Sequence, residues 1–156
     1  MNTKIRNVYI DDIPQLKKVI DSSELFPSEL LDDMISNYLT NKSSGEIWIT
    51  SINDDDIPIS IAFCVPEKLT EGTYNLYALA VHKEYQGKGI GCQIVQYLEN
   101  QLAKQKQHLL IIETSGLPSF HLTRKFYEKL DYKKEAIIKD FYSKGDDKVI
   151  FTKRFQ

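Results

Sequence analysis

Hydrophobic residues along the chain repeat with two periods, and each period predicts one kind of element. Apolar residues three and four positions apart predict helices that begin near Asp12 and near Pro27, and two more over Gly89–Lys106 and Ser119–Leu130. Alternating or continuous apolar runs predict strands over Thr3–Ile10, Glu46–Ile52, Ile57–Val65, Thr73–Val81, His108–Thr114, Tyr132–Ile138 and Lys148–Phe155. The order β-α-α-β-β-β-α-β-α-β-β predicts an α+β fold in which helices flank one mixed sheet.

Two polar segments between the predicted strands are interpreted as connections. Residues Asn53–Asp56 have the composition of a hairpin turn, and we prefer a solvated turn to a metal site because a helpfully spaced fourth ligand is missing. Residues Asp140–Asp147 are expected to form a loop between the last two strands. Thr73–Val81 is apolar on both faces, which indicates a central strand.

Composition narrows the class of protein. The chain has 156 residues, of which 42% are hydrophobic and 27% charged, and this length predicts a single domain over residues 1–156. The formal net charge is −2, and 17 of the 20 cations are lysine, which argues against a dedicated nucleic-acid binder. The two cysteines lack zinc-site spacing, and we find no signal peptide or membrane span, so a cytoplasmic protein is expected.

The most informative segment joins the strand that ends at Val81 to the helix that follows it. Its glycines, Gly87, Gly89 and Gly91, stand at a helix N-terminus, where bare backbone N–H groups and the helix dipole favour an anion such as a phosphate. The P-loop pattern fails because no Ser or Thr follows Lys88. A dinucleotide-binding pattern fits two glycines but has Cys92 at the third position, so it ranks second.

A third pattern, Gln or Arg followed by x-x-Gly-x-Gly or Ala, is matched by Gln86, Gly89 and Gly91. With it, the chain resembles the GNAT superfamily of acetyl-CoA-dependent N-acetyltransferases over essentially its whole length. A later segment, Thr123–Tyr132, agrees as well, although Asp131 stands where the family commonly has glycine. Asp tolerates left-handed backbone angles, so the turn should survive. The resemblance implies a mostly antiparallel sheet.

The resemblance also implies a site for the acyl donor. Backbone N–H groups of Gln86, Gly87, Lys88, Gly89, Ile90 and Gly91 would hold the pyrophosphate of coenzyme A (CoA). Leu79, Ala80 and Val81 would pair with the pantetheine arm like a neighbouring strand. A backbone N–H near Leu79 or Ala80 would polarise the thioester carbonyl.

Two side chains are candidates for proton transfer. The resemblance places the family's usual tyrosine at Tyr127, the candidate acid, and the alternative is a core tyrosine that shares a helical stripe with Phe120 and Leu130. Glu113 ends a buried-type strand and is the candidate base, as a glutamate is in some of the family's acetyltransferases that act on N-terminal amines. The alternative for Glu113 is an ion pair with a cation such as Arg124.

The resemblance implies direct acetyl transfer from acetyl-CoA to a primary amine, and we expect no metal. The acceptor would be a small-molecule amine or a peptide or protein amine, and homodimers are a frequent outcome in the family. We expect neither a nucleic-acid nor a membrane partner. The alternative from another class is a non-catalytic module that binds acetyl-CoA, which would need the glycine loop but neither Tyr127 nor Glu113.

Overall fold

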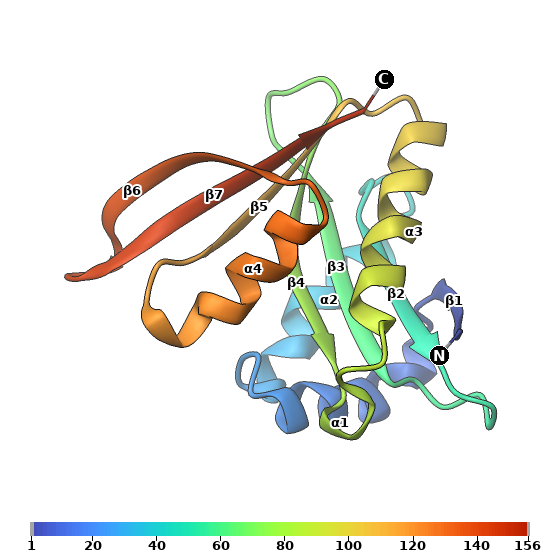
Figure 1. Ribbon diagram of the computed structural model, residues 1–156. Coiled ribbons are helices and arrows are strands. Elements are labelled where there is room, and N and C mark those ends of the chain that lie inside the picture. The colour runs from blue at the N-terminus through green and yellow to red at the C-terminus, as the bar shows by residue number, and fades with distance from the viewer. Residues whose placement is uncertain (1, 156) are drawn as a thin grey trace. The chain divides into compact units, whose positions relative to one another are not determined.

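The computed structural model describes residues 2–155. Its strands form one sheet in the order β1-β2-β3-β4-β5-β7-β6 (Figure 1). The strands are β1 (Lys4–Asn7), β2 (Ile47–Ile52), β3 (Ser60–Pro66), β4 (Thr73–Val81), β5 (Leu109–Ser115), β6 (Lys133–Ser143) and β7 (Asp146–Arg154). The helices are α1 (Ile13–Ser23), α2 (Leu31–Thr40), α3 (Ile90–Lys104) and α4 (His121–Lys129). Four short 3₁₀ helices, η1 (Ile10–Asp12), η2 (Ser28–Leu30), η3 (Lys83–Tyr85) and η4 (Pro118–Phe120), complete the order.

The pairing of the strands confirms the predicted fold class. Strands β1 and β2, β2 and β3, β5 and β7, and β6 and β7 pair antiparallel, whereas β4 and β5 pair in parallel. The sheet is therefore mixed and mostly antiparallel, with β4 inside it as its apolar sequence predicted. This topology is not the doubly wound parallel sheet that a dinucleotide-binding fold requires. The prediction of one domain over residues 1–156 stays a prediction.

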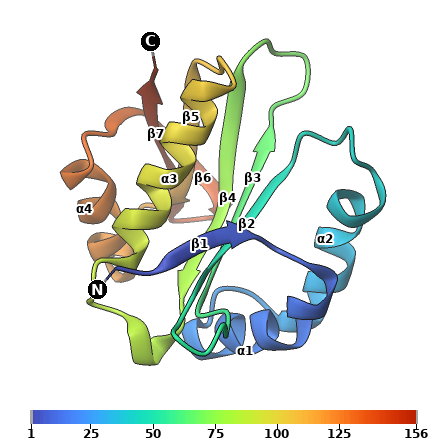
Figure 2. The same ribbon diagram turned by 90° about the vertical axis from the view of Figure 1, so that its right-hand side faces the viewer.

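The chain forms two compact units. Residues 2–65 and 77–101 make unit 1, and residues 66–76 and 102–155 make unit 2. In unit 1, α2 and α3 lie on opposite sides of the strands (Figure 2). The core that α1 and α2 share with the sheet is centred on Trp48, which stacks on Phe63 with ring centroids 3.9 Å apart. Small residues of β4, Ala78 and Ala80, complete this face.

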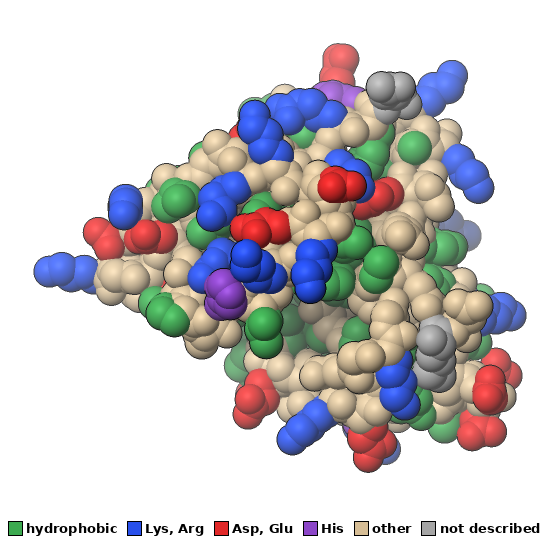
Figure 3. All heavy atoms as spheres, viewed as in Figure 1, with side chains coloured by type: hydrophobic (Ala, Val, Ile, Leu, Met, Phe, Trp, Pro, Cys, Tyr) green, Lys and Arg blue, Asp and Glu red, His purple; other side chains and the backbone are tan. Residues whose placement is uncertain are grey.

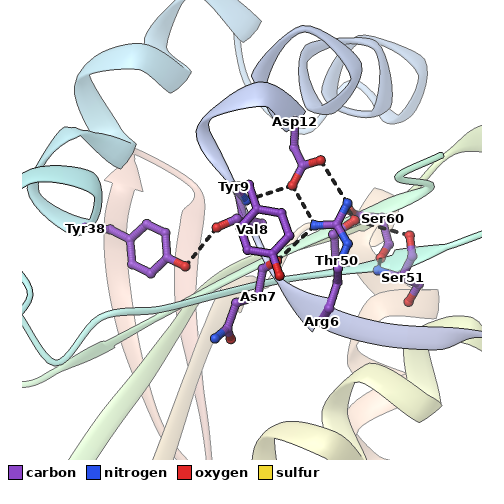
Figure 4. A network of polar contacts seen from close by, with 9 residues as sticks. All are labelled: Arg6, Asn7, Val8, Tyr9, Asp12, Tyr38, Thr50, Ser51 and Ser60. Atoms are coloured by element: carbon purple, nitrogen blue, oxygen red, sulfur yellow. Dashed lines mark hydrogen bonds and ion pairs between the residues drawn. The ribbon is translucent and has the colours of Figure 1, made fainter. Parts of the chain in front are cut away.

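A polar network ties β1 to the start of α1 (Figure 4). The carboxylate of Asp12 accepts hydrogen bonds from Arg6 Nη1 at 2.7 Å, from Arg6 Nη2 at 2.9 Å and from the backbone N–H of Tyr9 at 2.7 Å. Burial opposes ionisation of Asp12, but these hydrogen bonds and the charge of Arg6 outweigh it and lower the pKa of the carboxyl. Asp12 directly precedes α1, where the sequence predicted a helix to begin, but its carboxylate does not cap that helix because Arg6 and Tyr9 occupy it.

In unit 2, α4 packs on the sheet through Tyr127, whose ring lies 6.1 Å from that of Phe151 in β7. Lys and Arg side chains are gathered over α4 and the neighbouring β6–β7 hairpin (Figure 3). The hairpin is longer than predicted: most of the expected loop over 140–147 belongs to β6 and β7. Asp140 adopts a positive φ of 55°, and its N–H donates to Asp147 Oδ1, so a bulge absorbs the polar residues within the ladder.

Two turn predictions from the sequence are confirmed. Asp131 adopts the left-handed conformation, with φ 67°, at the position where the family commonly has glycine. Asn53 closes the β2–β3 connection: its Oδ1 accepts the N–H groups of Asp55 and Ile57. The acidic run therefore forms a turn, as its composition indicated.

Candidate active site

The glycine loop of unit 1 joins β4 to α3. Gly87 and Gly89 have φ angles of 76° and 82°, and a Cβ at either position would meet no atom within 4 Å. Glycine is therefore required here by the backbone conformation and not by crowding. The first N–H groups of a helix lack intrahelical acceptors, so the start of α3 presents donors directly after this turn. Such a turn can hold an anion.

Neighbouring segments of unit 1 hold the approach to this loop in place. The N–H of His82 donates to the carbonyl of Ile59 at 2.8 Å, and the N–H of Lys83 donates to Ser22 Oγ at 3.1 Å. The side chain of Gln86 donates from Nε2 to the carbonyl of Val81 at 3.0 Å. Gln86, the first residue of the predicted motif, therefore closes the loop back onto the end of β4.

Side chains at the end of β4 differ in burial on the two faces of the strand. Ala80 is buried in the core that contains α1 and α2, whereas Leu79 and Val81 are half-buried. Residues 73–76 of β4 pair in parallel with residues 109–112 of β5. The segment Leu79–Val81, which is predicted to pair with the pantetheine arm, follows them along β4.

Glu113 of unit 2 lies in a polar cluster near the end of β5. Its Oε1 accepts a hydrogen bond from Asn75 Nδ2 at 2.9 Å, and its Oε2 pairs with Lys148 Nζ at 2.5 Å. The side chain of Glu113 is 26% exposed and that of Lys148 is 12% exposed. An ion pair was expected as the alternative role for Glu113, but its cation is Lys148 and not Arg124.

Arg124 instead supports the segment that follows β5. Its Nη1 donates to the carbonyl oxygens of Ser115 and Leu117, at 2.8 and 2.9 Å. Ser115 Oγ in turn donates to Asp146 Oδ1 and accepts the N–H of Leu117. These contacts link the start of β7 and the start of α4 to the end of the strand that carries Glu113.

Tyr127 lies in an aromatic cluster of unit 2. It is 6% exposed, and its ring is 5.1 Å from that of Phe126 and 5.8 Å from that of Tyr132. Burial raises the pKa of the Tyr127 hydroxyl, so the group keeps its proton at neutral pH. The core location that the sequence offered as an alternative is therefore observed, and the assignment of Tyr127 as acid stays a prediction.

The sequence-predicted residues thus occupy three kinds of surroundings. Gln86 to Gly91 form the turn of unit 1, Glu113 lies among polar groups of unit 2, and Tyr127 lies among aromatic rings of the same unit. Asn75 and Lys148 were missed. A buried asparagine within the otherwise apolar run of β4 was a signal that could have been followed, whereas Lys148 gave none.

Residues 2–155 contain no group of three or more His, Cys, Asp or Glu side chains placed to hold a metal ion. Cys64 is buried, and burial raises the pKa of its thiol. None of the helices over these residues is long and apolar enough to cross a membrane.

Comparison with known proteins decides the family. The model of the GNAT acetyltransferase domain matches residues 43–134, which is more than half of the chain. The chain belongs to the GNAT family of N-acetyltransferases. The dinucleotide-binding alternative is thereby set aside, and the match includes the glycine loop, Glu113 and Tyr127.

Individual GNAT relatives extend the similarity to nearly the full length. A solved GNAT-family structure from Desulfovibrio desulfuricans is 30% identical, with a TM-score of 0.89, and the match covers 98% of this chain and 99% of that one. An N-alpha-acetyltransferase of Saccharolobus solfataricus is 22% identical over 96% of this chain and 91% of its own length. An uncharacterized N-acetyltransferase of Methanocaldococcus jannaschii is 29% identical, and the match spans about half of each protein, 53%.

Proposed function

We propose that this GNAT protein transfers an acetyl group from acetyl-CoA directly to a primary amine. The observation that carries the proposal is the glycine turn, because Gly87 and Gly89 adopt left-handed angles directly before the start of α3. Several backbone N–H groups can then bind one pyrophosphate, each charge-assisted hydrogen bond contributing about 1.5–3 kcal/mol. Leu79, Ala80 and Val81 would bind the pantetheine arm, and a backbone N–H of Leu79 or Ala80 would polarise the thioester carbonyl.

Glu113 is the proposed base. An acceptor amine must lose a proton before it attacks, and for a lysine-like amine with pKa ~10.4 this costs about 4.6 kcal/mol at pH 7. The hydrogen bond from Asn75 and the ion pair with Lys148 fix the position of the Glu113 carboxylate at the end of β5. A charged carboxylate can take the amine's proton directly or through a water molecule.

Tyr127 is the proposed acid. A tyrosine whose pKa is raised by burial remains protonated throughout the neutral range. It therefore acts best as a hydrogen-bond donor to the sulfur of the departing CoA, which stabilises the developing thiolate without requiring full loss of the tyrosine proton. Direct transfer needs no acyl-enzyme, so no nucleophilic cysteine is assigned.

The acceptor is proposed to be the primary amine of a peptide N-terminus or of a small molecule. The relative from Saccharolobus solfataricus carries the name N-alpha-acetyltransferase, which supports testing peptide N-termini first. Since acetyl-CoA is a cytoplasmic co-substrate in the proposed reaction, the cytoplasm is the proposed compartment.

Release of free CoA thiol from acetyl-CoA, followed across peptide N-termini, amino acids, polyamines and aminoglycosides, tests the proposal. We expect saturable release with one class of amine, and a fall of about 10²–10⁴-fold in kcat/KM for Glu113→Gln and for Tyr127→Phe. Glu128→Gln is the matched control, because Glu128 is an exposed carboxylate of α4 paired with Lys125 at 3.7 Å. Saturable acetyl-CoA binding without thiol release from any amine would instead favour the non-catalytic binding module.

A further inference from the structure

Lys148 lies on β7, and its ammonium group contacts side chains of the two strands that flank β7, namely β5 and β6. Its Nζ lies 2.5 Å from Glu113 Oε2 of β5 and 3.5 Å from the centre of the Phe141 ring of β6. The lysine side chain is 12% exposed. A carboxylate and an aromatic face both attract an ammonium ion.

The charged groups near the Lys148 ammonium include two carboxylates, which favour a cation. Tyr142, next to Phe141 in β6, has a raised pKa because burial disfavours its charged form and because the negative charges of Glu113 and Asp146 act on it. Two carboxylates therefore act on the same region of unit 2. A cation that left this region would leave Glu113, whose side chain is 26% exposed, without its charged partner unless another cation took its place.

Asn75 supplies an independent sign that a hydrogen-bond donor is accommodated here. It is 3% exposed, and its Nδ2 donates to Glu113 Oε1 at 2.9 Å. The oxygen of the same amide, Oδ1, is buried and has no hydrogen-bond partner among residues 2–155. Because buried acceptors are nearly always paired in native proteins, this oxygen is able to accept an N–H of a bound ammonium group.

We propose that Glu113, Phe141 and Asn75 form a binding site for a primary ammonium group, and that Lys148 occupies this site until an acceptor amine takes its place. The identity of the amine as an acetyl acceptor rests on the proposed function, whereas the ammonium site itself does not. Lysine suits such a role because its flexible four-carbon stem lets the charged end move without moving the strand. Lys148 then acts as an internal competitor that selects for primary amines.

Truncation of the lysine tests the site without reference to catalysis. In Lys148→Ala, n-butylammonium chloride should bind about fivefold more tightly than in the wild type, the factor that a partly exposed ion pair contributes. Saturable binding would be measured by calorimetry and as a rise in Tm at constant ionic strength. Butan-1-ol, which has the same stem without the charge, should raise Tm in neither protein.

Two further variants define the controls. Lys139→Ala removes a lysine of the same hairpin that is 82% exposed and paired with Asp147 at 3.7 Å, and it should bind n-butylammonium no better than the wild type. Adding Glu113→Gln to Lys148→Ala should abolish the increase in affinity for n-butylammonium. If Lys148→Ala does not fold, Lys148→Thr, with a side chain favourable in strands, is measured instead.

The outcomes separate this inference from the proposed function. Equal affinity for n-butylammonium in the wild type, Lys148→Ala and the double variant would overturn the ammonium site, whether or not acetyl transfer is observed. If n-butylammonium binds as expected but thiol release is never detected, the site stands and the proposed function fails. Where transfer is observed, Lys148→Ala should lower the KM of the acceptor amine, and an unchanged KM would overturn the competition by Lys148.

Discussion

Replacing Asp12 with Asn is expected to lower the free energy of unfolding by about 2–3 kcal/mol at pH 7. Breaking a fully buried ion pair costs about 3–5 kcal/mol, and an exposed pair contributes about 0.2–1 kcal/mol. The side chains of Asp12 and Arg6 are 9% and 19% exposed, so the cost should fall between these limits. Asparagine keeps one acceptor but turns an N–H donor toward the guanidinium, which leaves at least one of three hydrogen bonds unmade.

Equilibrium unfolding in urea, followed by the fluorescence of Trp48, measures this cost. Trp48 is the single tryptophan of the chain, is fully buried and lies in the same unit as Asp12. Asp32→Asn is the matched control, because Asp32 pairs with Lys17 at 2.6 Å but is 57% exposed, and its loss should cost at most about 1 kcal/mol. Arg6→Met completes a double-mutant cycle with Asp12→Asn, in which the pair should show a coupling free energy.

The difference in unfolding free energy between the wild type and Asp12→Asn should also depend on pH. The pKa of Asp12 is lowered in the folded state, so the stability that its charge contributes is fully present above the unfolded pKa of about 3.9. That stability is lost as the pH falls through the lower folded pKa. The difference between the wild type and Asp12→Asn should therefore be constant from pH 7 to about 5 and shrink below pH 4. A cost no larger than that of Asp32→Asn, or one that persists unchanged at pH 3, would refute the reasoning.

Three further predictions concern residues of the glycine loop and of unit 2. Gly89→Ala should add about 1–2 kcal/mol of backbone strain and weaken acetyl-CoA binding in calorimetry, whereas Gly89→Asn should weaken it less. Tyr127 has a raised folded pKa, so the wild type should lose stability as the pH rises above about 10, and Tyr127→Phe should make that loss smaller in Tm measurements. Asp131→Ala should lower stability by about 1 kcal/mol in urea unfolding while Asp131→Gly does not; equal losses would contradict the role of the positive φ.

The order of the elements could be predicted because most of them bury apolar residues in a pattern typical of a helix or a strand. The spacing of Leu16, Val19 and Ile20 matches the buried face of α1, whereas β2 is buried at all of its positions and was marked by its apolar residues and not by alternating burial. The end of β6 could not be predicted in this way. All of its residues are exposed, so no periodicity distinguishes strand from loop, and the bulge at Asp140 breaks the alternation further.

The candidate site was predictable where a motif fixes the backbone and not where a partner fixes a side chain. The glycine spacing implies left-handed turns at Gly87 and Gly89, because few other residues adopt such angles. The partners of Glu113 come from β4 and β7, which lie 38 and 35 positions away along the chain. Such pairs depend on strand order and register, so the local sequence could identify the carboxylate but offered Arg124 only as an example of a cation, whereas the partner is Lys148.

The outer strand β6 also carries features that oppose pairing with a further strand. It is the last strand in the sheet order and pairs with β7 on one side, and it exposes Ile137 and Ile138 at 50% and 44%. An open edge with apolar side chains is a template for aggregation, and bulges and lysines are the usual protection. Here the register shifts on both sides of these isoleucines, and Lys134 and Lys139 flank them. The register shifts and lysines that prevented prediction of the end of β6 from the sequence are thus features that disfavour the addition of a further strand to the sheet.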